Sequence, residues 1–383
     1  MNSGANQMSD NECFDAALTQ GITFSDDCKT LVKCPEDVTC VIIPPCVTSI
    51  GNSAFEECQC LTEVKIPDSV TSIGNRAFYQ CKSLADIKIP DSVTSIGEGA
   101  FARCEKLTEI KIPDGVTSIE KYTFSGCINI TKIEIPDSVT SIGNNAFWNC
   151  ESLTDIKIPD GITSIGDWTF SGCASLIGIK IPDSVTSIGD SAFFYCESLT
   201  EINIPNGITS IENKTFALCD NLKNLEIPDS VTSIGDEAFR ECTSLQCIKI
   251  PNGVTSIGEK VFWNCSFMKN IEIPDSVTSI GDSAFFYCIS LKKIKIPASV
   301  IWIGNNAFAW CDKLTEAEIF LGTKYNCWNT FPVWCKIVRR FSIRAVFRRI
   351  FGKKTDIQPS KKLGVNGLTE FENLRNRIRH IRY

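Results

Sequence analysis

Apolar residues recur along most of this chain in one fixed order. A unit begins with the alternating pattern L-x-x-I-x-I, continues through Pro and a V-x-x-I segment, and ends with A-F-x-x-C, as in residues 61–81. The Ile-Pro step has its proline at residues 44, 67, 90, 113, 136, 159, 182, 205, 228, 251, 274 and 297, always 23 residues apart. A strict period of this length indicates a repeat architecture.

Each unit has a readable local structure. The alternation of β-branched residues before the proline predicts a short strand, which the proline ends because it cannot donate to the next ladder hydrogen bond. Pro-Asp-Ser or Pro-Asp-Gly predicts a turn, and V-T-S-I-G predicts a second short extended segment. In Asp190-Ser191-Ala192-Phe193 and its equivalents, Asp or Asn is placed to cap one helical turn.

A single 23-residue coil cannot bury its own apolar side chains, so it must stack on its neighbours. Twelve phenylalanines, from Phe55 to Phe308, and twelve cysteines, from Cys58 to Cys311, fall on the period and should form continuous columns. The sequence therefore predicts a curved solenoid of about twelve coils, with parallel strands and short helical turns.

The chain divides into four parts. Residues 1–43 hold an N-terminal segment and an incomplete capping repeat, and residues 44–319 hold the array. Residues 320–335 form an aromatic cap, because Phe320, Tyr325, Trp328, Phe331, Pro332 and Trp334 break the period and are apolar enough to cover the open end. Residues 336–383 are a basic tail that ends in a predicted amphipathic helix after a capping box at residues 369–372.

Composition narrows the possible chemistry. The chain has 383 residues, 43% of them hydrophobic, which favours a folded body over a disordered polymer. His380 is its one histidine, so a Ser-His-Asp triad, a Cys-His dyad or a two-histidine metal site is hard to build. We therefore expect a non-enzymatic protein with no cofactor, no metal and no small-molecule substrate.

The 21 cysteines invite a metal or redox interpretation. The twelve periodic ones are better explained as small, polarisable core side chains. Cys28, Cys34, Cys40 and Cys46 are evenly spaced along the chain, and two disulfides or a four-thiolate zinc site can be drawn through them. Zinc sites usually use closely spaced cysteine pairs, which argues against zinc here. An odd number of cysteines without a visible signal peptide favours mostly reduced thiols.

Charge is divided unevenly along the chain. Residues 336–383 carry 14 Lys and Arg against 3 Asp and Glu, a balance of +11, which leaves −18 for residues 1–335 within the total of −7. The acidic body argues against nucleic acid as its partner, whereas the tail can contact phosphates or an anionic membrane surface. The arginines that alternate with apolar residues in the tail are its candidate contacts: Arg339, Arg340, Arg344, Arg348 and Arg349.

No targeting signal is visible in this sequence. Residues 1–30 lack a basic start followed by an apolar core, and the one long apolar stretch, residues 337–351, contains five arginines. These features predict neither a signal peptide nor a membrane-spanning helix, and taken alone they favour the cytoplasm.

Two sets of outward positions are candidate binding surfaces. The strand positions carry interleaved acidic and basic side chains, for which a solvated face is the simplest explanation. Aromatic residues that follow the periodic Phe are more suggestive, although neighbouring coils can also cover them. These aromatic candidates are Tyr79, Trp148, Phe194, Tyr195, Trp263, Phe286, Tyr287 and, one place later, Trp310.

The repeat resembles the BspA-like leucine-rich repeat family, whose 23-residue signature I-P-x-S-V-T-S-I-G-x-x-A-F-x-x-C is matched over about residues 31–319. This resemblance implies a curved solenoid that binds other proteins, often as a bacterial or protist surface protein or adhesin. Residues 21–25 and 31–35 also resemble the lead-in to such arrays.

The expected function is therefore a protein-binding scaffold used in adhesion or partner interaction, at the cell surface if the resemblance holds for location. Two alternatives stay open: an intracellular adaptor tethered by its basic tail to membrane or nucleic acid, and an enzyme with its chemistry in the terminal segments.

Overall fold

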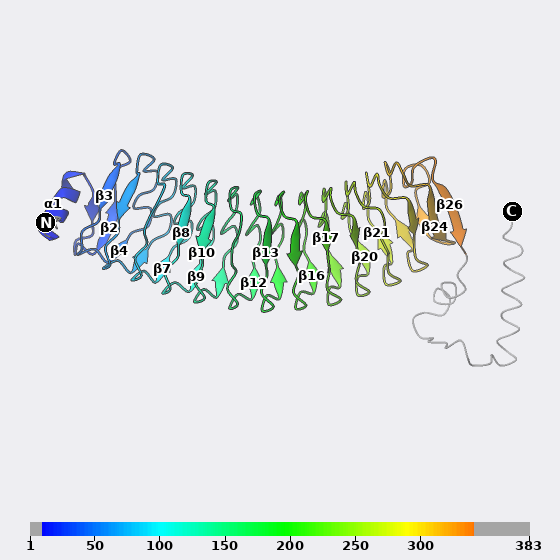
Figure 1. Ribbon diagram of the computed structural model, residues 1–383, viewed down its shortest axis with the longest axis horizontal. Helices are drawn as coiled ribbons and strands as arrows, with labels where there is room; N and C mark the ends of the chain where they lie inside the picture. The colour runs from blue at the N-terminus through cyan, green and yellow to red at the C-terminus, as the bar shows by residue number, and fades with distance from the viewer. Residues whose placement is uncertain (1–9, 341–383) are drawn as a thin grey trace, which may run out of the picture. The chain divides into compact units, whose positions relative to one another are not determined.

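The structure is a computed structural model that describes residues 10–340. In it the coils follow one another in a single row from the N-terminal helix α1 (Asp10–Thr19) to the last strand, β26 (Lys336–Arg340) (Figure 1). About fourteen coils with a spacing of about 23 residues are present, and almost none of this body is helical. The predicted parallel solenoid is confirmed, with more coils than the twelve expected.

Segments before each proline form what we call the strand face. They pair in parallel and in register, with Ile133 opposite its equivalent in the preceding coil, Ile110. Inward-facing residues such as Ile110 are buried and their neighbours are exposed, as period-two alternation requires. Its strands are β3 (Cys40–Ile42), β5 (Glu63–Lys65), β8 (Glu109–Lys111), β10 (Lys132–Glu134), β13 (Gly178–Lys180), β15 (Glu201–Asn203), β17 (Asn224–Leu225), β19 (Cys247–Ile248), β22 (Lys293–Lys295), β24 (Glu316–Phe320) and β26.

The V-T-S-I segments form a second set of parallel strands, the serine face. Each strand is two residues long, with the first side chain outward and the second buried, except that Tyr325 in the last strand is half-buried. Its strands are β4 (Ser49–Ile50), β6 (Ser72–Ile73), β7 (Ser95–Ile96), β9 (Ser118–Ile119), β11 (Ser141–Ile142), β12 (Ser164–Ile165), β14 (Ser187–Ile188), β16 (Ser210–Ile211), β18 (Ser233–Ile234), β20 (Ser256–Ile257), β21 (Ser279–Ile280), β23 (Trp302–Ile303) and β25 (Lys324–Tyr325).

The third side of the coil, the turn face, carries the Ala-Phe segment and differs from the prediction. No helical turn forms in the repeats over residues 20–340. Instead, alternate amides donate to carbonyls of the next coil, as Ser191, Phe193 and Tyr195 do, each at 2.9 Å. The amides between them close tight turns within the coil, as Phe194 does on Ser191. The inter-coil bonds outcompete a helix because one helical turn satisfies few amides of its own.

This arrangement requires left-handed backbone conformations twice per coil. In the coil that contains Ser191 and Tyr195, these two residues have φ of 54° and 60°. Gly126 and Gly172 occupy the second of these positions in other coils, with φ of 74° and 77°. Left-handed geometry costs about 1–2 kcal/mol for a residue with a Cβ, so the repeated inter-coil bonds must compensate for it.

A column of phenylalanines fills the centre of the solenoid. The twelve residues from Phe55 to Phe308 are fully buried. Consecutive rings stack with centroids 4.8 to 5.8 Å apart, as for Phe55 with Phe78 and Phe124 with Phe147. Near-parallel rings at this distance combine large apolar burial with favourable aromatic geometry, so the predicted column is the main apolar link between coils.

The cysteine column has a specific hydrogen-bonding role. Each thiol from Cys81 to Cys311 donates to the carbonyl of the periodic Phe in the preceding coil; the Cys196 thiol lies 3.2 Å from the Phe170 oxygen. Burial and this bond explain why a small side chain with a polar hydrogen occupies the site.

The N-terminal end has its own cap. β1 (Thr23–Phe24) and β2 (Thr30–Lys33) pair antiparallel, and Leu31 of β2 lies beside Ile50 of the first serine-face strand. Helix α1, which the sequence patterns did not predict, packs there through Phe14, whose ring centroid lies 4.8 Å from that of Phe24. These elements cover the first coil, where an incomplete repeat was expected.

The prediction that residues 320–335 form a lid over the C-terminal end is wrong. Phe331 does not break the period: it stacks on Phe308, its equivalent in the preceding coil, with ring centroids 5.0 Å apart. Trp328 and Trp334, expected to cover the core, are 88% and 54% exposed. Residues 320–335 therefore continue the solenoid, because the Phe column outweighs the loss of the other repeat positions.

The predicted boundary between the solenoid and the tail, before residue 336, is also wrong. Residues 336–340 were assigned to the basic tail, but they form β26, which pairs in parallel with β24 along its full length. The compact unit accordingly ends at Arg340. Pairing with an exposed strand edge satisfies the β24 backbone and explains the extension. The rest of the tail, with Arg344, Arg348, Arg349 and the expected final helix, lies outside the described residues.

The cysteine column yields a first prediction. Cys196→Ala should lower the free energy of unfolding by about 1–2 kcal/mol, because it leaves a cavity and an unpaired Phe170 lone pair. Cys247→Ala, at an exposed strand position, should change it by less than about 0.5 kcal/mol. Urea unfolding measures both values. A neutral Cys196→Ala variant, or zinc lost specifically from it, would contradict a structural role.

The left-handed positions yield a second prediction. Gly126→Ala should cost about 1–2 kcal/mol, since φ of 74° strains a residue with a Cβ. Gly178→Ala is the matched control: its added Cβ would meet only the Glu201 carbonyl at 3.8 Å, and its φ is not positive. Thermal melts of the two variants should separate clearly. Equal melting temperatures would show that the turn-face backbone differs from this structure.

Candidate functional site

The turn face holds the predicted aromatic residues. The side chain after the periodic Phe and the left-handed residue that follows it both point away from the core, because the backbone between coils fixes their direction. Among the eight candidates, Trp148, Tyr195, Tyr287 and Trp310 are exposed, with Trp310 at 61%. Tyr79, Phe194, Trp263 and Phe286 are half-buried. Neighbouring coils therefore cover this set only in part.

Several of these aromatic residues contact one another across coils. Trp263 and Phe286 stack with ring centroids 5.9 Å apart and an angle of 2° between their planes. Tyr287 follows Phe286 at 6.5 Å, and the Arg240 guanidinium lies 5.3 Å from the Trp263 ring centroid. We call Trp263, Phe286, Tyr287 and Trp310 the second aromatic cluster. Mutual packing holds Trp263, Phe286 and Tyr287 in place without fully burying them.

A first aromatic cluster lies earlier in the array, and the sequence pattern predicted only part of it. Trp168, 37% exposed, contacts Phe194 with ring centroids 5.7 Å apart. Tyr122, 44% exposed, occupies the same repeat position two coils earlier. Both lie two residues before the periodic Phe, at the first left-handed position, whereas the predicted aromatic residues all follow the Phe. The first aromatic cluster therefore comprises Tyr122, Trp148, Trp168, Phe194 and Tyr195.

Tyr195 of the first cluster also carries a polar group, its hydroxyl. The Glu197 carboxylate accepts a hydrogen bond from Tyr195 and raises the pKa of its hydroxyl. Tyr195 therefore presents an apolar ring and a polar hydroxyl at the same surface. Such side chains are common anchors in protein interfaces.

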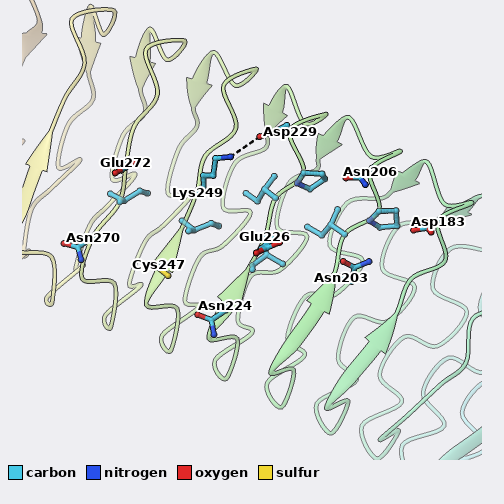
Figure 2. Close-up of a pocket in the computed structure, with 17 residues that line it drawn as sticks. Asp183, Asn203, Asn206, Asn224, Glu226, Asp229, Cys247, Lys249, Asn270 and Glu272 are labelled. Carbon is cyan, nitrogen blue, oxygen red and sulfur yellow. Dashed lines mark hydrogen bonds and ion pairs between the residues drawn. The ribbon is translucent and has the colours of Figure 1, made fainter.

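The strand face carries a groove of about 870 Å³ over β15, β17 and β19. Figure 2 shows Asn203, Asn224 and Asn270 among the residues that line it. Lys249 forms the one ion pair drawn there, at 3.3 Å from Asp229. Glu226 and Glu272 also line the groove and make no ion pair with any described residue. Its chemistry is amide-rich and mildly acidic.

Elsewhere on the strand face, opposite charges neutralise each other as expected. Lys132 donates to Glu134, which raises the pKa of the lysine and lowers that of the glutamate. These groups are exposed, so the pairs contribute little to stability. The other ion pairs from this face are Lys65–Glu63, Lys157–Asp137, Lys293–Glu316 and Arg340–Glu318.

From Cys81 to Cys311 the thiols of the cysteine column have raised pKa values, whereas a hydrogen bond with Cys34 lowers the pKa of Cys58 at the start of the column. Burial raises the pKa of Cys127, Cys173, Cys219 and Cys288 to about 12, so they are protonated at neutral pH. At the N-terminal end Cys34 is buried, Cys28 and Cys46 are half-buried, and Cys40 is exposed. Across residues 10–340 no group of three or more potential ligands is arranged to hold a metal ion.

The two described arginines of the predicted basic contact lie in β26. Arg340 pairs with Glu318 at 3.4 Å, and Arg339 donates to the Tyr325 hydroxyl at 3.3 Å. Both are therefore part of the solenoid end. Within the described part of the chain, no helix is long and apolar enough to span a membrane.

Comparison with known proteins identifies the repeat. The model of the BspA-type leucine-rich repeat region matches residues 27–154, 140–269 and 266–345. A leucine-rich repeat protein from Bacteroides ovatus is 29% identical, with a TM-score of 0.72, covering 83% of this chain and 90% of its own. A leucine-rich cell surface protein from Faecalibacterium prausnitzii is 36% identical, with a TM-score of 0.40, covering 61% of this chain and 79% of its own. No curated protein matches the chain.

The family match spans nearly the whole array described above. Leucine-rich repeat proteins are generally protein-interaction scaffolds. The chain belongs to the BspA-type leucine-rich repeat family.

Proposed function

We propose that this protein is a non-enzymatic scaffold that binds a partner protein through the two aromatic clusters of its turn face. The observation that carries the proposal is the group of large aromatic side chains that the solenoid leaves exposed although its core is complete without them. Exposed apolar groups of this size are costly to hydrate, and they mark interaction surfaces more often than isolated apolar residues do.

The packing of the clusters supports a binding role. Side chains that already stack on a neighbour, as Trp263 does on Phe286, lose little conformational freedom when a partner covers them. Trp, Tyr and Arg are also the residues that most often dominate interface energies. The Arg240–Trp263 pair combines two of them in one place.

The charged rows of the strand face are weaker candidates for the main contact. Their ion pairs are exposed and satisfied within the chain, so a partner would have to break them for little gain. Adhesion at a cell surface is the biological use that fits a rigid, repetitive binding surface best. An intracellular adaptor tethered through the basic tail would use the same aromatic clusters.

The test begins with site-specific cross-linking in the native cell. A photoreactive phenylalanine analogue at position 195 or 287 should trap one protein at a defined mass, while the analogue at position 157 on the strand face should not. Trapping only from position 157 would move the contact to the strand face.

Variants of the clusters then measure the contact. With the trapped partner purified, Trp148→Ala and Tyr287→Ala should each weaken binding by about 30-fold, as expected for an aromatic anchor worth about 2 kcal/mol. A combined change of Lys88, Lys111 and Lys157 to Ala should alter it by less than about threefold. Circular dichroism checks that each variant folds. The reverse ranking would refute the aromatic assignment.

A further inference from the structure

One segment of the serine face differs in sequence from the repeat, and packing of the core does not require the difference. The pair Thr-Ser, found in the eleven preceding coils, becomes Ile301-Trp302. Trp302 keeps its place in the strand register, opposite Ser279 on one side and Lys324 on the other. Its ring is 45% exposed, so it does not serve to seal the solenoid.

A cavity of about 390 Å³ opens beside this tryptophan. It lies at the end of the array, where the step from β23 to β25 is shorter than the repeat period and β26 adds a strand beyond β24. Its lining residues are Trp302, Asn305, Thr323, Lys324, Tyr325, Asn326, Cys327 and Arg339. The volume lies within the range of small-molecule pockets and is near its lower end.

The two charged side chains that line this cavity are both cations. Lys324 and Arg339 line it, and no carboxylate does. Among the described residues neither forms an ion pair, whereas the neighbouring Arg340 is paired with Glu318. Two unpaired cations are notable in a body that is otherwise strongly acidic, and together they favour an oxyanion.

The polar side chains of the cavity are oriented as donors. The Asn326 amide nitrogen donates to the Asn305 amide oxygen at 3.3 Å, which leaves the Asn305 NH₂ group free to donate. The Trp328 backbone amide donates to the Asn326 oxygen at 3.1 Å and fixes this orientation. Arg339 is held by its bond to the Tyr325 hydroxyl. Held donors beside cations stabilise an anion at a low cost in side-chain entropy.

We infer that this cavity binds a small ligand made of a planar ring that carries an oxyanion, either a phosphate or a carboxylate. The ring packs on Trp302, and the oxyanion accepts hydrogen bonds from Lys324, Arg339 and Asn305. The site lies on the serine face and does not depend on the aromatic clusters of the turn face. It would give the scaffold a second, separate specificity for a small molecule or an exposed ligand group.

The test titrates the full-length protein with three probes by calorimetry. Adenosine 5′-monophosphate and indole-3-acetate each combine a ring with an oxyanion, and adenosine is the neutral control. At least one anionic probe should bind at a single site, about tenfold or more tighter than adenosine, and more weakly at high salt. Binding of the phosphate alone or of the carboxylate alone identifies the source of the anion.

Two variants locate the binding. Trp302→Ser restores the residue of the preceding coils, so it should preserve the fold while weakening the probe at least fivefold. Lys324→Gln should weaken it about tenfold, the loss expected for one charge-assisted hydrogen bond. Trp334→Ala, an exposed tryptophan outside the cavity, is the matched control and should bind normally. Failure of both anionic probes to bind, equal binding of adenosine, or unchanged binding in both cavity variants would overturn the inference.

Discussion

The structure depends on one constraint: each residue of a coil must lie directly beside its equivalent in the next coil. Backbone donors on three faces find acceptors in the neighbouring coil, and each periodic Phe stacks on the Phe of the coil beside it. A single coil has neither a hydrogen-bonded edge nor an apolar core of its own, so stability arises between coils. The constant repeat length is the sequence expression of this requirement.

The same constraint separates structure from function along the repeat. Inward positions are locked because a change is felt by two neighbours, whereas outward positions vary from coil to coil without disturbing the register. The aromatic clusters, the amide-rich groove and the cationic cavity all arise from substitutions at outward positions. A leucine-rich repeat solenoid can therefore carry several surfaces of different chemistry on one rigid support.

The sequence predicted the parts of the fold that repeat. The period alone placed the two strand sets, the Phe column and the Cys column. The predicted helical turn was wrong because residues such as Ser191 and Tyr195 have no preference for left-handed geometry. Only hydrogen bonds to the next coil impose that geometry. The predicted C-terminal lid was wrong because Phe331 keeps the 23-residue period of the Phe column, while the strands around it follow one another after fewer residues. Tyr122 and Trp168 of the first aromatic cluster were not predicted, because their outward direction also depends on the left-handed backbone. The cavity was not predicted, because residue spacing does not show which side chains are hydrogen-bonded or ion-paired.

The claim that alignment between coils stabilises this protein is tested most directly by changing the length of one coil. Duplicating residues 176–198, one whole period, should give a folded protein whose melting temperature is close to the original, because every column stays aligned. Inserting one glycine after Asp183 should cost about 3 kcal/mol or more, since it displaces buried side chains and inter-coil hydrogen bonds together. Denaturant unfolding of the two variants decides the question. A glycine insertion that is tolerated as well as the full-coil duplication would contradict the claim that alignment between coils holds this protein together.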